Sequence, residues 1–134
     1  MSTAKLNLIL EDTVELLKLG RSGIQFSLFE KIMNSSSYTL KQWSNFLHIT
    51  ERTIQRYKKE QKRFEPIHSE RILEIAKLNK KGRDVFGSVQ NFEIWMNSNI
   101  IALGGIMPSE LLDSSFGIDL ISDELGRIEH GVFA

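Results

Sequence analysis

Apolar residues recur every three to four positions along almost the whole chain, which is the spacing of one face of an α-helix. We find no convincing run in which apolar and polar residues alternate, the pattern of a half-buried strand. The sequence therefore predicts an all-α protein. The ranges expected to be helical are 5–19, 24–33, 67–81, 88–97 and 118–129, with a further short helix after Pro108.

Glycine and capping residues predict where several of these helices begin and end. The first helix should break near residues 20–23, and the 67–81 helix should end at Gly82. Ser88 is suited to cap the next helix, and Gly131 stands where a glycine would end the last one. The side chains expected inside the two C-terminal helices are Val89, Phe92, Trp95, Ile118, Ile121, Leu125 and Ile128.

Residues 39–60 fit a helix-turn-helix, in which two short helices cross and the second enters the major groove of DNA. His48 stands at the turn position that takes a positive φ, where Gly is commonest and His is tolerated. Thr50 is suited to cap the second helix, and Ser44 is small where a large residue would hold the helices apart. The residues expected to be buried between the two helices are Trp43, Leu47, Ile49, Ile54 and Tyr57.

The second helix of this pair carries the side chains expected to bind DNA. Residues 51–63 hold six basic and two acidic residues, in a chain whose formal net charge is zero. Arg can hold guanine through two hydrogen bonds and Gln can hold adenine, so the expected base readers are Arg52, Gln55 and Arg56. The residues expected to contact phosphates, which position without specifying sequence, are Lys58, Lys59, Lys62 and Arg63. The full set predicted to bind DNA on the helix is Thr50, Arg52, Thr53, Gln55, Arg56, Lys58 and Lys59.

Charge is unevenly distributed, although the total is zero. Residues 50–85 hold eleven basic and six acidic residues, whereas residues 110–134 hold six acidic residues and Arg127. Such a division indicates two different partners, or two surfaces that meet in a dimer. A homodimer is also expected because the apolar stripes of the 67–81 and 118–129 helices are more than one small core readily covers. The alternative for the basic stretch is a solvated helix in an ordinary α-helical bundle.

Several classes of function are not indicated. No apolar run approaches the roughly 20 residues that a membrane helix needs, and the N-terminus reaches acidic residues too early for a signal peptide. The chain has no cysteine and hence no disulfide or thiol chemistry, and the cytoplasm is the expected compartment. His48, His68 and His130 are too far apart in sequence for a local metal pattern, and no phosphate loop or nucleophile elbow occurs. We therefore expect no enzyme, no metal, no cofactor and no membrane partner.

The chain ends on GVFA, so an aromatic residue follows directly after the predicted last helix. Chain termini are usually polar and frayed. Phe133 can fold back onto the protein's own core, and the residues alone favour this interpretation. The alternative is that the tail enters the cleft of a partner.

Several short motifs occur together over residues 39–134, in order and with natural spacing. They are RTxxR (Arg52 to Arg56), SxR[IL] (Ser69 to Ile72), VFG (Val85 to Gly87), Trp95, ALGGxxP (Ala102 to Pro108), LLD (Leu111 to Asp113) and LxRIExGxFA (Leu125 to Ala134). The last motif is the most specific. Together they resemble the Xre/MbcA/ParS-type antitoxins of RES–Xre toxin–antitoxin systems.

The resemblance implies a fold and a function. The fold is all-α, with an N-terminal Xre-like helix-turn-helix unit in residues 1–66 and a C-terminal helical unit for toxin binding and dimerisation in residues 67–134. The function is that of an antitoxin that neutralises a RES-type toxin, a NAD-consuming enzyme, by occluding its active-site cleft. The chain would also repress its own operon as a dimer bound to operator DNA.

The family's toxin-binding element lies at the C-terminus, so the resemblance favours the tail as a plug for the toxin's cleft. The residues it implies for toxin binding are Arg127, Glu129, His130, Gly131, Val132, Phe133 and Ala134. Two positions depart from the family pattern, since His48 stands where Gly is usual and His130 where an aromatic residue such as Tyr is common. The alternative functions are a helix-turn-helix transcriptional regulator without a toxin partner and an enzyme that acts on NAD.

Overall fold

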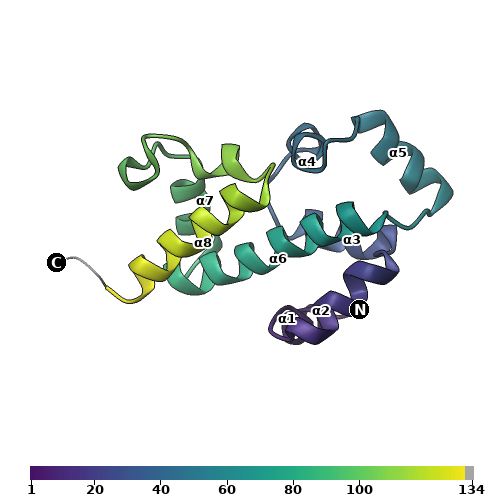
Figure 1. Ribbon diagram of the computed structural model, residues 1–134, viewed down its shortest axis with the longest axis horizontal. Coiled ribbons are helices and arrows are strands. Elements are labelled where there is room, and N and C mark those ends of the chain that lie inside the picture. Colours follow the sequence, from purple (N-terminus) through teal and green to yellow (C-terminus); the bar gives the residue numbers. More distant parts are fainter. Residues whose placement is uncertain (132–134) are drawn as a thin grey trace. The chain divides into compact units, whose positions relative to one another are not determined.

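The computed structural model of the protein describes residues 1–131. These residues form eight α-helices and two short 3-10 helices, so the predicted all-α fold is confirmed (Figure 1). Contacts divide the chain into two compact units, which we call unit 1 (Met1–Lys77) and unit 2 (from Leu78 onward). This division lies inside the long helix over Pro66–Phe86, whereas the sequence indicates a boundary between residues 66 and 67, at the start of that helix. The limits of the functional domains stay a prediction.

Unit 1 contains five complete helices and the first part of a sixth. The helices are α1 (Thr3–Leu10), α2 (Thr13–Ser22), α3 (Phe26–Asn34), α4 (Leu40–Leu47), α5 (Glu51–Glu60) and α6 (Pro66–Phe86). The three helices α3, α4 and α5 lie where the sequence predicts them, because each has its own amphipathic spacing and is bounded by polar turn residues.

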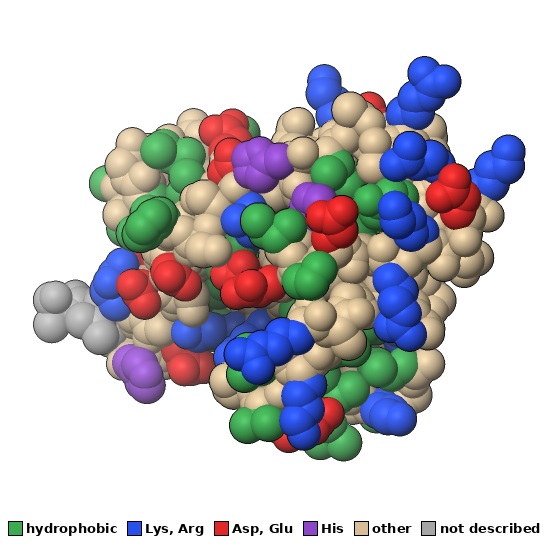
Figure 2. All heavy atoms as spheres, turned by 45° about the vertical axis from the view of Figure 1, so that its right-hand side comes forward, with side chains coloured by type: hydrophobic (Ala, Val, Ile, Leu, Met, Phe, Trp, Pro, Cys, Tyr) green, Lys and Arg blue, Asp and Glu red, His purple; other side chains and the backbone are tan. Residues whose placement is uncertain are grey.

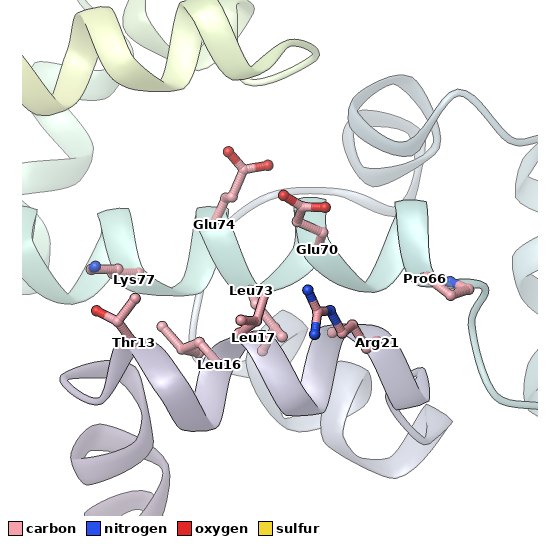
Figure 3. Close-up of a pocket in the computed structure, with 10 residues that line it drawn as sticks. Thr13, Leu16, Leu17, Arg21, Pro66, Glu70, Leu73, Glu74 and Lys77 are labelled. Carbon is pink, nitrogen blue, oxygen red and sulfur yellow. The ribbon is translucent and has the colours of Figure 1, made fainter.

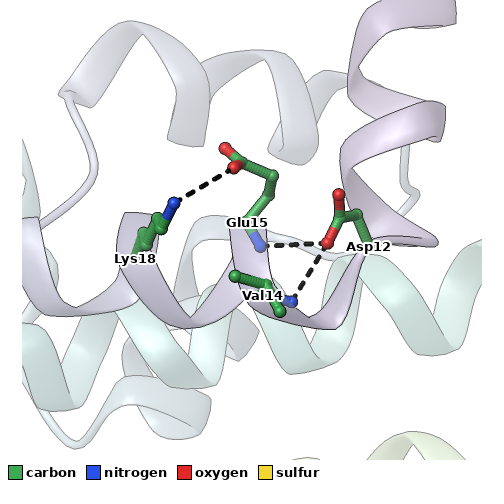
Figure 4. A network of polar contacts seen from close by, with 4 residues as sticks. All are labelled: Asp12, Val14, Glu15 and Lys18. Atoms are coloured by element: carbon green, nitrogen blue, oxygen red, sulfur yellow. Dashed lines mark hydrogen bonds and ion pairs between the residues drawn. The ribbon is translucent and has the colours of Figure 1, made fainter.

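The predicted single helix over residues 5–19 is wrong, because two helices meet there. Asp12 adopts an extended backbone, and its Oδ1 accepts the amide N–H groups of Val14 at 3.1 Å and Glu15 at 3.2 Å (Figure 4). A side chain that satisfies these amides begins a new helix, so α2 is separate from α1. The predicted break near residues 20–23 is confirmed, because α2 ends at Ser22 and Gly23 follows it with a φ of 80°.

An aromatic cluster forms the core of unit 1. The ring centroids of Phe29 and Trp43 lie 5.2 Å apart, and those of Phe29 and Phe64 lie 4.9 Å apart. Aromatic pairs at such distances contribute about 0.5–1.5 kcal/mol each beyond their burial. Phe26 and Phe46 complete the cluster, and all five rings are buried. The cluster joins α3, α4 and the loop before α6. It therefore fixes α4, the helix against which α5 packs.

Buried hydrogen bonds join the start of α3 to the loop before α6. The amide of Phe64 donates to the carbonyl of Ile24 at 3.0 Å. The buried Oγ of Ser69 accepts the amide of Ile24 at 2.9 Å and donates to the carbonyl of Phe64 at 3.2 Å. Because buried polar groups are costly when unpaired, these bonds fix α6 against α3 within unit 1.

Unit 2 begins in the second half of α6, which is longer than the sequence predicts. Gly82 lies inside the helix instead of ending it. A Cβ at this position would lie 2.1 Å from the ring of Phe92 in α7 (Val89–Met96), so the missing side chain lets the two helices pack closely. The predicted end of the helix at residue 81 is therefore wrong, and α6 runs to Phe86.

α7 is capped by Ser88, whose Oγ accepts the amide of Asn91 at 3.1 Å, as predicted. Its buried face differs from the prediction, because Val89 is 41% exposed and Trp95 is only partly buried, while Met96 is buried. The apolar spacing of a helix of eight residues fits more than one face. Packing within unit 2 decides which face of α7 is buried, and the spacing of apolar residues alone does not decide it.

Two short 3-10 helices and α8 complete the described part of unit 2. They are η1 (Ile101–Leu103), η2 (Pro108–Leu111) and α8 (Ser115–Glu129). α8 starts before the predicted Ile118, because the Oγ of Ser114 accepts the amide of Gly117 at 3.0 Å and so caps the helix earlier. The side chains of Ile118, Ile121 and Leu125 are buried on its inner face, as predicted, whereas Ile128, which was predicted with them, is only partly buried.

Candidate nucleic-acid and protein-binding sites

α4 and α5 form the predicted helix-turn-helix, and local hydrogen bonds fix its turn. His48 ends α4 with a φ of 56°, in the left-handed region, as predicted for this position. The Oγ of Ser44 donates to the carbonyl of Ile49 at 2.6 Å. The Oγ1 of Thr50 accepts the amide of Thr53 at 3.0 Å and caps α5, which is also as predicted.

Apolar side chains between α4 and α5 set the direction in which α5 faces. The buried ones are Trp43, Leu47, Ile54 and Tyr57, and Ile49 in the turn is partly buried. A helix that is buried along one stripe turns the opposite side to solvent. The seam predicted from the spacing is confirmed, and it determines which residues of α5 can meet a partner.

The exposed side of α5 carries Arg52, Gln55, Arg56 and Lys59, which we call the α5 face. These positions are spaced i, i+3, i+4 and i+7, so their side chains lie on one side of the helix. Within residues 1–131, the side chains of Arg52, Gln55 and Lys59 have no hydrogen bond or ion pair. The guanidinium of Arg56 lies 5.7 Å from the centre of the Tyr57 ring. Figure 2 shows Lys and Arg side chains standing out over the part of unit 1 that carries α5.

Three other residues predicted to bind DNA also make contacts inside the protein. The ammonium of Lys58 lies 3.3 Å from the carboxylate of Glu30 in α3. Such an exposed pair adds little stability, at most about 1 kcal/mol, but it offsets the positive charge of Lys58. The hydroxyl groups of Thr50 and Thr53 lie 2.9 Å apart at the start of α5. The α5 face is therefore the set of donors most open to a ligand.

The two basic residues that follow α5 are held close to the same helix. The ammonium of Lys62 lies 4.9 Å from the centre of the Tyr57 ring. The guanidinium of Arg63 donates to the carbonyl of Gly23 at 3.0 Å. These contacts fix both side chains beside the end of α5, and their role at phosphates stays a prediction.

Arg71 supports the helix-turn-helix from α6. Its Nη1 donates to the carbonyl of Phe46 at 2.9 Å. That carbonyl is among the last four of α4, which have no partner in the helix itself, and a cation there complements the helix dipole. Glu74 lies 3.7 Å from the Nε of Arg71. In the sequence, Arg71 stands out only as part of a motif, because its partner Phe46 lies 25 residues away.

His68 lies near the same turn, at the start of α6. Burial lowers the pKa of His68 below its ordinary value, and His48 and Arg71 lower this pKa further, while Glu65 opposes the shift. This shift favours the neutral form of the His68 imidazole. The Arg and Lys side chains of the α5 face offer positive charge to a ligand.

The end of α8 carries the described part of the predicted toxin-binding element. Arg127 forms an ion pair with Glu124, with an N–O distance of 2.6 Å. The imidazole of His130 lies 4.0 Å from the carboxylate of Glu129, and both side chains are exposed. Gly131 follows the cap of the helix with a φ of 63°, as expected of a residue that ends a helix.

Three further predictions lie at the limits of what the structure describes. Val132, Phe133 and Ala134 fall outside the described residues, so the folded-back tail and the plug both stay predictions. Within residues 1–131, no group of three or more His, Asp or Glu side chains is placed to hold a metal ion. In the same part of the chain, no helix is long and apolar enough to cross a membrane.

Two protein-family models match the chain. Residues 15–77 match the Antitoxin Xre-like helix-turn-helix domain. Residues 81–131 match the Antitoxin Xre/MbcA/ParS C-terminal toxin-binding domain. The first match contains the α5 face, and the second contains η1, η2 and α8.

Three curated relatives are similar to parts of the chain. Antitoxin Xre of Yersinia enterocolitica is 36% identical over 87 residues, which cover 64% of this chain and 59% of the relative. Antitoxin Xre of Photorhabdus laumondii is 27% identical over 111 residues, covering 82% and 75% of the two chains. The Prs ADP-ribosylating antitoxin of a Sphingobium species is 35% identical over 75 residues, covering 49% and 47%. The chain thus spans less than two-thirds of the length of the Yersinia and Sphingobium relatives.

Proposed function

The chain belongs to the Xre/MbcA/ParS-like antitoxins, and on this basis we propose that it neutralises a partner toxin and binds operator DNA. One observation carries the proposal: a helix-turn-helix with an open basic face is joined in one chain to a unit that matches a toxin-binding domain. Each unit would serve one partner. The opposite charges of residues 50–85 and 110–134 support this division.

The α5 face would enter the major groove of the operator. Arg52, Gln55 and Arg56 would read bases, because their donors and acceptors match base edges. Lys59 would hold a phosphate and so position the helix. By binding there, the chain would repress its own operon in the cytoplasm, where that DNA lies.

The toxin would be a RES-type enzyme that consumes NAD. The name of the Sphingobium relative joins ADP-ribosylation to an antitoxin, and ADP-ribosyl transfer uses NAD as its donor. Residues 127–134 would occlude the active-site cleft of the toxin. The chain itself would act by binding and not as an enzyme, in keeping with the names of the Yersinia and Photorhabdus relatives.

Co-expression with the product of the adjacent gene tests this function. We expect that gene to encode a RES-like protein that stops growth when expressed alone and is recovered with the tagged chain in a pull-down. The double variant Arg52→Ala/Arg56→Ala is the control, because it should lose operator binding and still recover the toxin.

Two results would count against the antitoxin. Failure to recover or neutralise any neighbouring product would favour the alternative, a helix-turn-helix regulator without a toxin. Loss of NAD in the presence of the purified chain alone would favour an enzyme.

We also propose that the chain is a homodimer. The apolar stripes on α6 and α8, from which the sequence predicts a dimer, are buried within the protein and do not support a dimer. Support comes instead from a groove of about 470 Å³ between α2 and α6, which lies wholly in unit 1 (Figure 3). The residues that line it include Leu16, Leu17, Leu73, Arg21, Lys77, Glu70 and Glu74. An apolar groove with charges of both signs suits a two-fold contact, because each cation can face an anion of the second copy.

Light scattering at micromolar concentration should give about twice the 15.4 kDa mass of one chain. Leu17→Asp, in the groove, should shift the mass toward that of a single chain, because a buried unpaired charge is unfavourable in an interface. Leu8→Asp on α1 is the matched control, since Leu8 is exposed and does not line the groove. A wild-type chain with the mass of one copy would contradict the dimer.

A further inference from the structure

A large aromatic side chain stands exposed at the start of α8. Phe116 is 90% exposed, and Leu120, one turn later, is 42% exposed. Positions i and i+4 are neighbours on a helix surface, so the two side chains form one apolar strip. Single exposed apolar residues are ordinary, whereas an exposed Phe beside a Leu on one helix marks a candidate contact surface.

Packing fixes the direction of this strip. The residues buried on the opposite side of α8 are Ile118, Ile121 and Leu125. A Cβ on Gly117 would lie 2.0 Å from the carbonyl oxygen of Leu111, so the start of the helix is pressed against η2. α8 cannot turn Phe116 inward without exposing its own core residues. The exposure of Phe116 is therefore a consequence of the fold.

Acidic residues flank the strip along the chain. The exposed ones close to it in sequence are Glu110, Asp113, Asp119 and Asp123. Arg127, further along the same side of α8, is paired with Glu124. We call Phe116, Asp119, Leu120 and Asp123 the outer face of α8, because their spacing places them on the side of the helix away from its buried residues. This face has an apolar centre and an acidic rim.

We propose that the toxin docks on the outer face of α8, with Phe116 and Leu120 in an apolar hollow of the toxin and the acidic rim against its basic groups. This proposal rests on the proposed function. One observation and one chemical argument select this partner. The face lies within residues 81–131, which match the toxin-binding domain. An enzyme that binds the diphosphate of NAD carries basic groups around its cleft, and an acidic rim complements them.

The same chemistry argues against other occupants. In a two-fold contact through this face, each acidic rim would meet its own copy, and like charges across an interface are strongly unfavourable. Nucleic acid is disfavoured too, because its phosphates carry the same sign as the rim. A partner with a basic surface is the occupant that the charges allow.

The outer face of α8 leads toward the end of the helix. From Phe116 to His130 the chain advances about 21 Å, at 1.5 Å per residue. A toxin that held Phe116 would therefore reach along the exposed side of the helix as far as His130. Contacts over this length suit the roughly 800 Å² that each partner buries in a stable complex.

Calorimetric titration of the purified full-length chain into the RES-like product of the adjacent gene tests the docking surface. Phe116→Asp should weaken the affinity about 30-fold or more, as substitutions at interface hot spots do, and Phe116→Leu should retain most of it. Ile94→Asp on α7 is the matched control, because Ile94 is a 67% exposed apolar residue of the same unit. The affinity of the Ile94→Asp variant for the toxin should stay within roughly threefold of the wild-type affinity, as for most positions that do not contribute to an interface.

Charge gives a second measurement. The variant Asp119→Asn/Asp123→Asn should weaken binding more at low salt than at high salt, because salt screens exposed charges. Thermal unfolding and operator binding should be unchanged in every variant, since the substituted side chains are exposed and lie outside unit 1.

Each outcome has a distinct meaning. Wild-type affinity in Phe116→Asp would overturn the docking surface and leave the antitoxin function standing. Equal losses in Phe116→Asp and Ile94→Asp would overturn it as well, because the effect would not be specific to the outer face of α8. If the wild-type chain does not bind the toxin, the proposed function fails, and the docking surface with it.

Discussion

Replacing Arg52 or Arg56 by Ala should remove most of the difference in affinity between operator DNA and unrelated DNA. Both side chains lie on the α5 face, exposed to solvent on the side away from the buried seam. A bidentate contact between Arg and guanine provides roughly 1–3 kcal/mol of discrimination, so each substitution should cost on the order of 5- to 150-fold. Gln55→Ala should act in the same way at an adenine.

Substitutions of Lys58 and Lys59 can be compared with those of the two arginines. Lys59→Ala should weaken binding to all DNA and reduce the slope of log affinity against log salt by about 0.9, the effect of one phosphate contact. Lys58→Ala should have a smaller effect, because Glu30 lies 3.3 Å from its ammonium and already offsets the charge. Toxin neutralisation should survive all of these changes.

A gel-shift titration of operator and unrelated DNA over a range of salt concentrations measures both the ratio of the two affinities and the dependence of each affinity on salt. The assignment of base readers would be wrong if the Arg and Lys variants changed the two affinities in the same proportion. Equal salt slopes for Lys58→Ala and Lys59→Ala would show that the Glu30 pair does not shield Lys58 when DNA is bound.

The helix-turn-helix could be predicted in detail because its determinants are local. The cap at Thr50, the left-handed turn at His48 and the seam through Ile54 and Tyr57 all follow from spacing within residues 39–60. Each of these signals acts over a few residues, where the geometry of the chain is known in advance. The same holds for the inner face of α8.

The wrong predictions at Asp12 and Gly82 have different physical reasons. The break at Asp12 carried a local signal, since Asp is a favoured N-cap, but the apolar spacing continues across it and hid the break. The extension of α6 past Gly82 had no local signal. It depends on the ring of Phe92, which occupies the space that a side chain on Gly82 would need.

The finer structure of the candidate sites depends on contacts between distant parts of the chain. Lys58 and Lys59 are neighbours in sequence, and the contact of Lys58 with Glu30 on α3 distinguishes their charges. Arg71 reaches the carbonyl of Phe46 across 25 residues. Phe116 would be expected inside a helix core by its type alone, and only the packing of α8 shows that it faces outward. Such pairings cannot be read from spacing, because the sequence does not reveal which helices meet.

Deleting residues 131–134 should leave a folded chain that still binds DNA but no longer protects cells from the toxin. The buried residues of α8 are Ile118, Ile121 and Leu125, and the helix ends at Glu129. The deletion therefore removes none of the buried side chains described for unit 2. The α5 face lies in unit 1 and should keep its affinity for the operator.

The tail would act on the toxin through the apolar side chain of Phe133. Burial of the Phe133 side chain is worth roughly 1.5–3 kcal/mol, which is about 10- to 150-fold in affinity. This side chain would block the cleft, whereas the outer face of α8 would supply separate contacts.

The truncated chain should consequently still be recovered with the toxin in a pull-down, while the toxin in that complex still consumes NAD. Growth of cells that co-express both proteins, and NAD consumption by the purified complex, measure the two effects separately. Phe133→Ala should give partial protection. His130→Tyr, which restores the aromatic residue common in the family, is the matched control and should protect at least as well as the natural chain. If the truncated protein protects cells as fully as the whole chain does, the plug is refuted, and the fold-back of Phe133 onto the protein's own core becomes the better account of the tail.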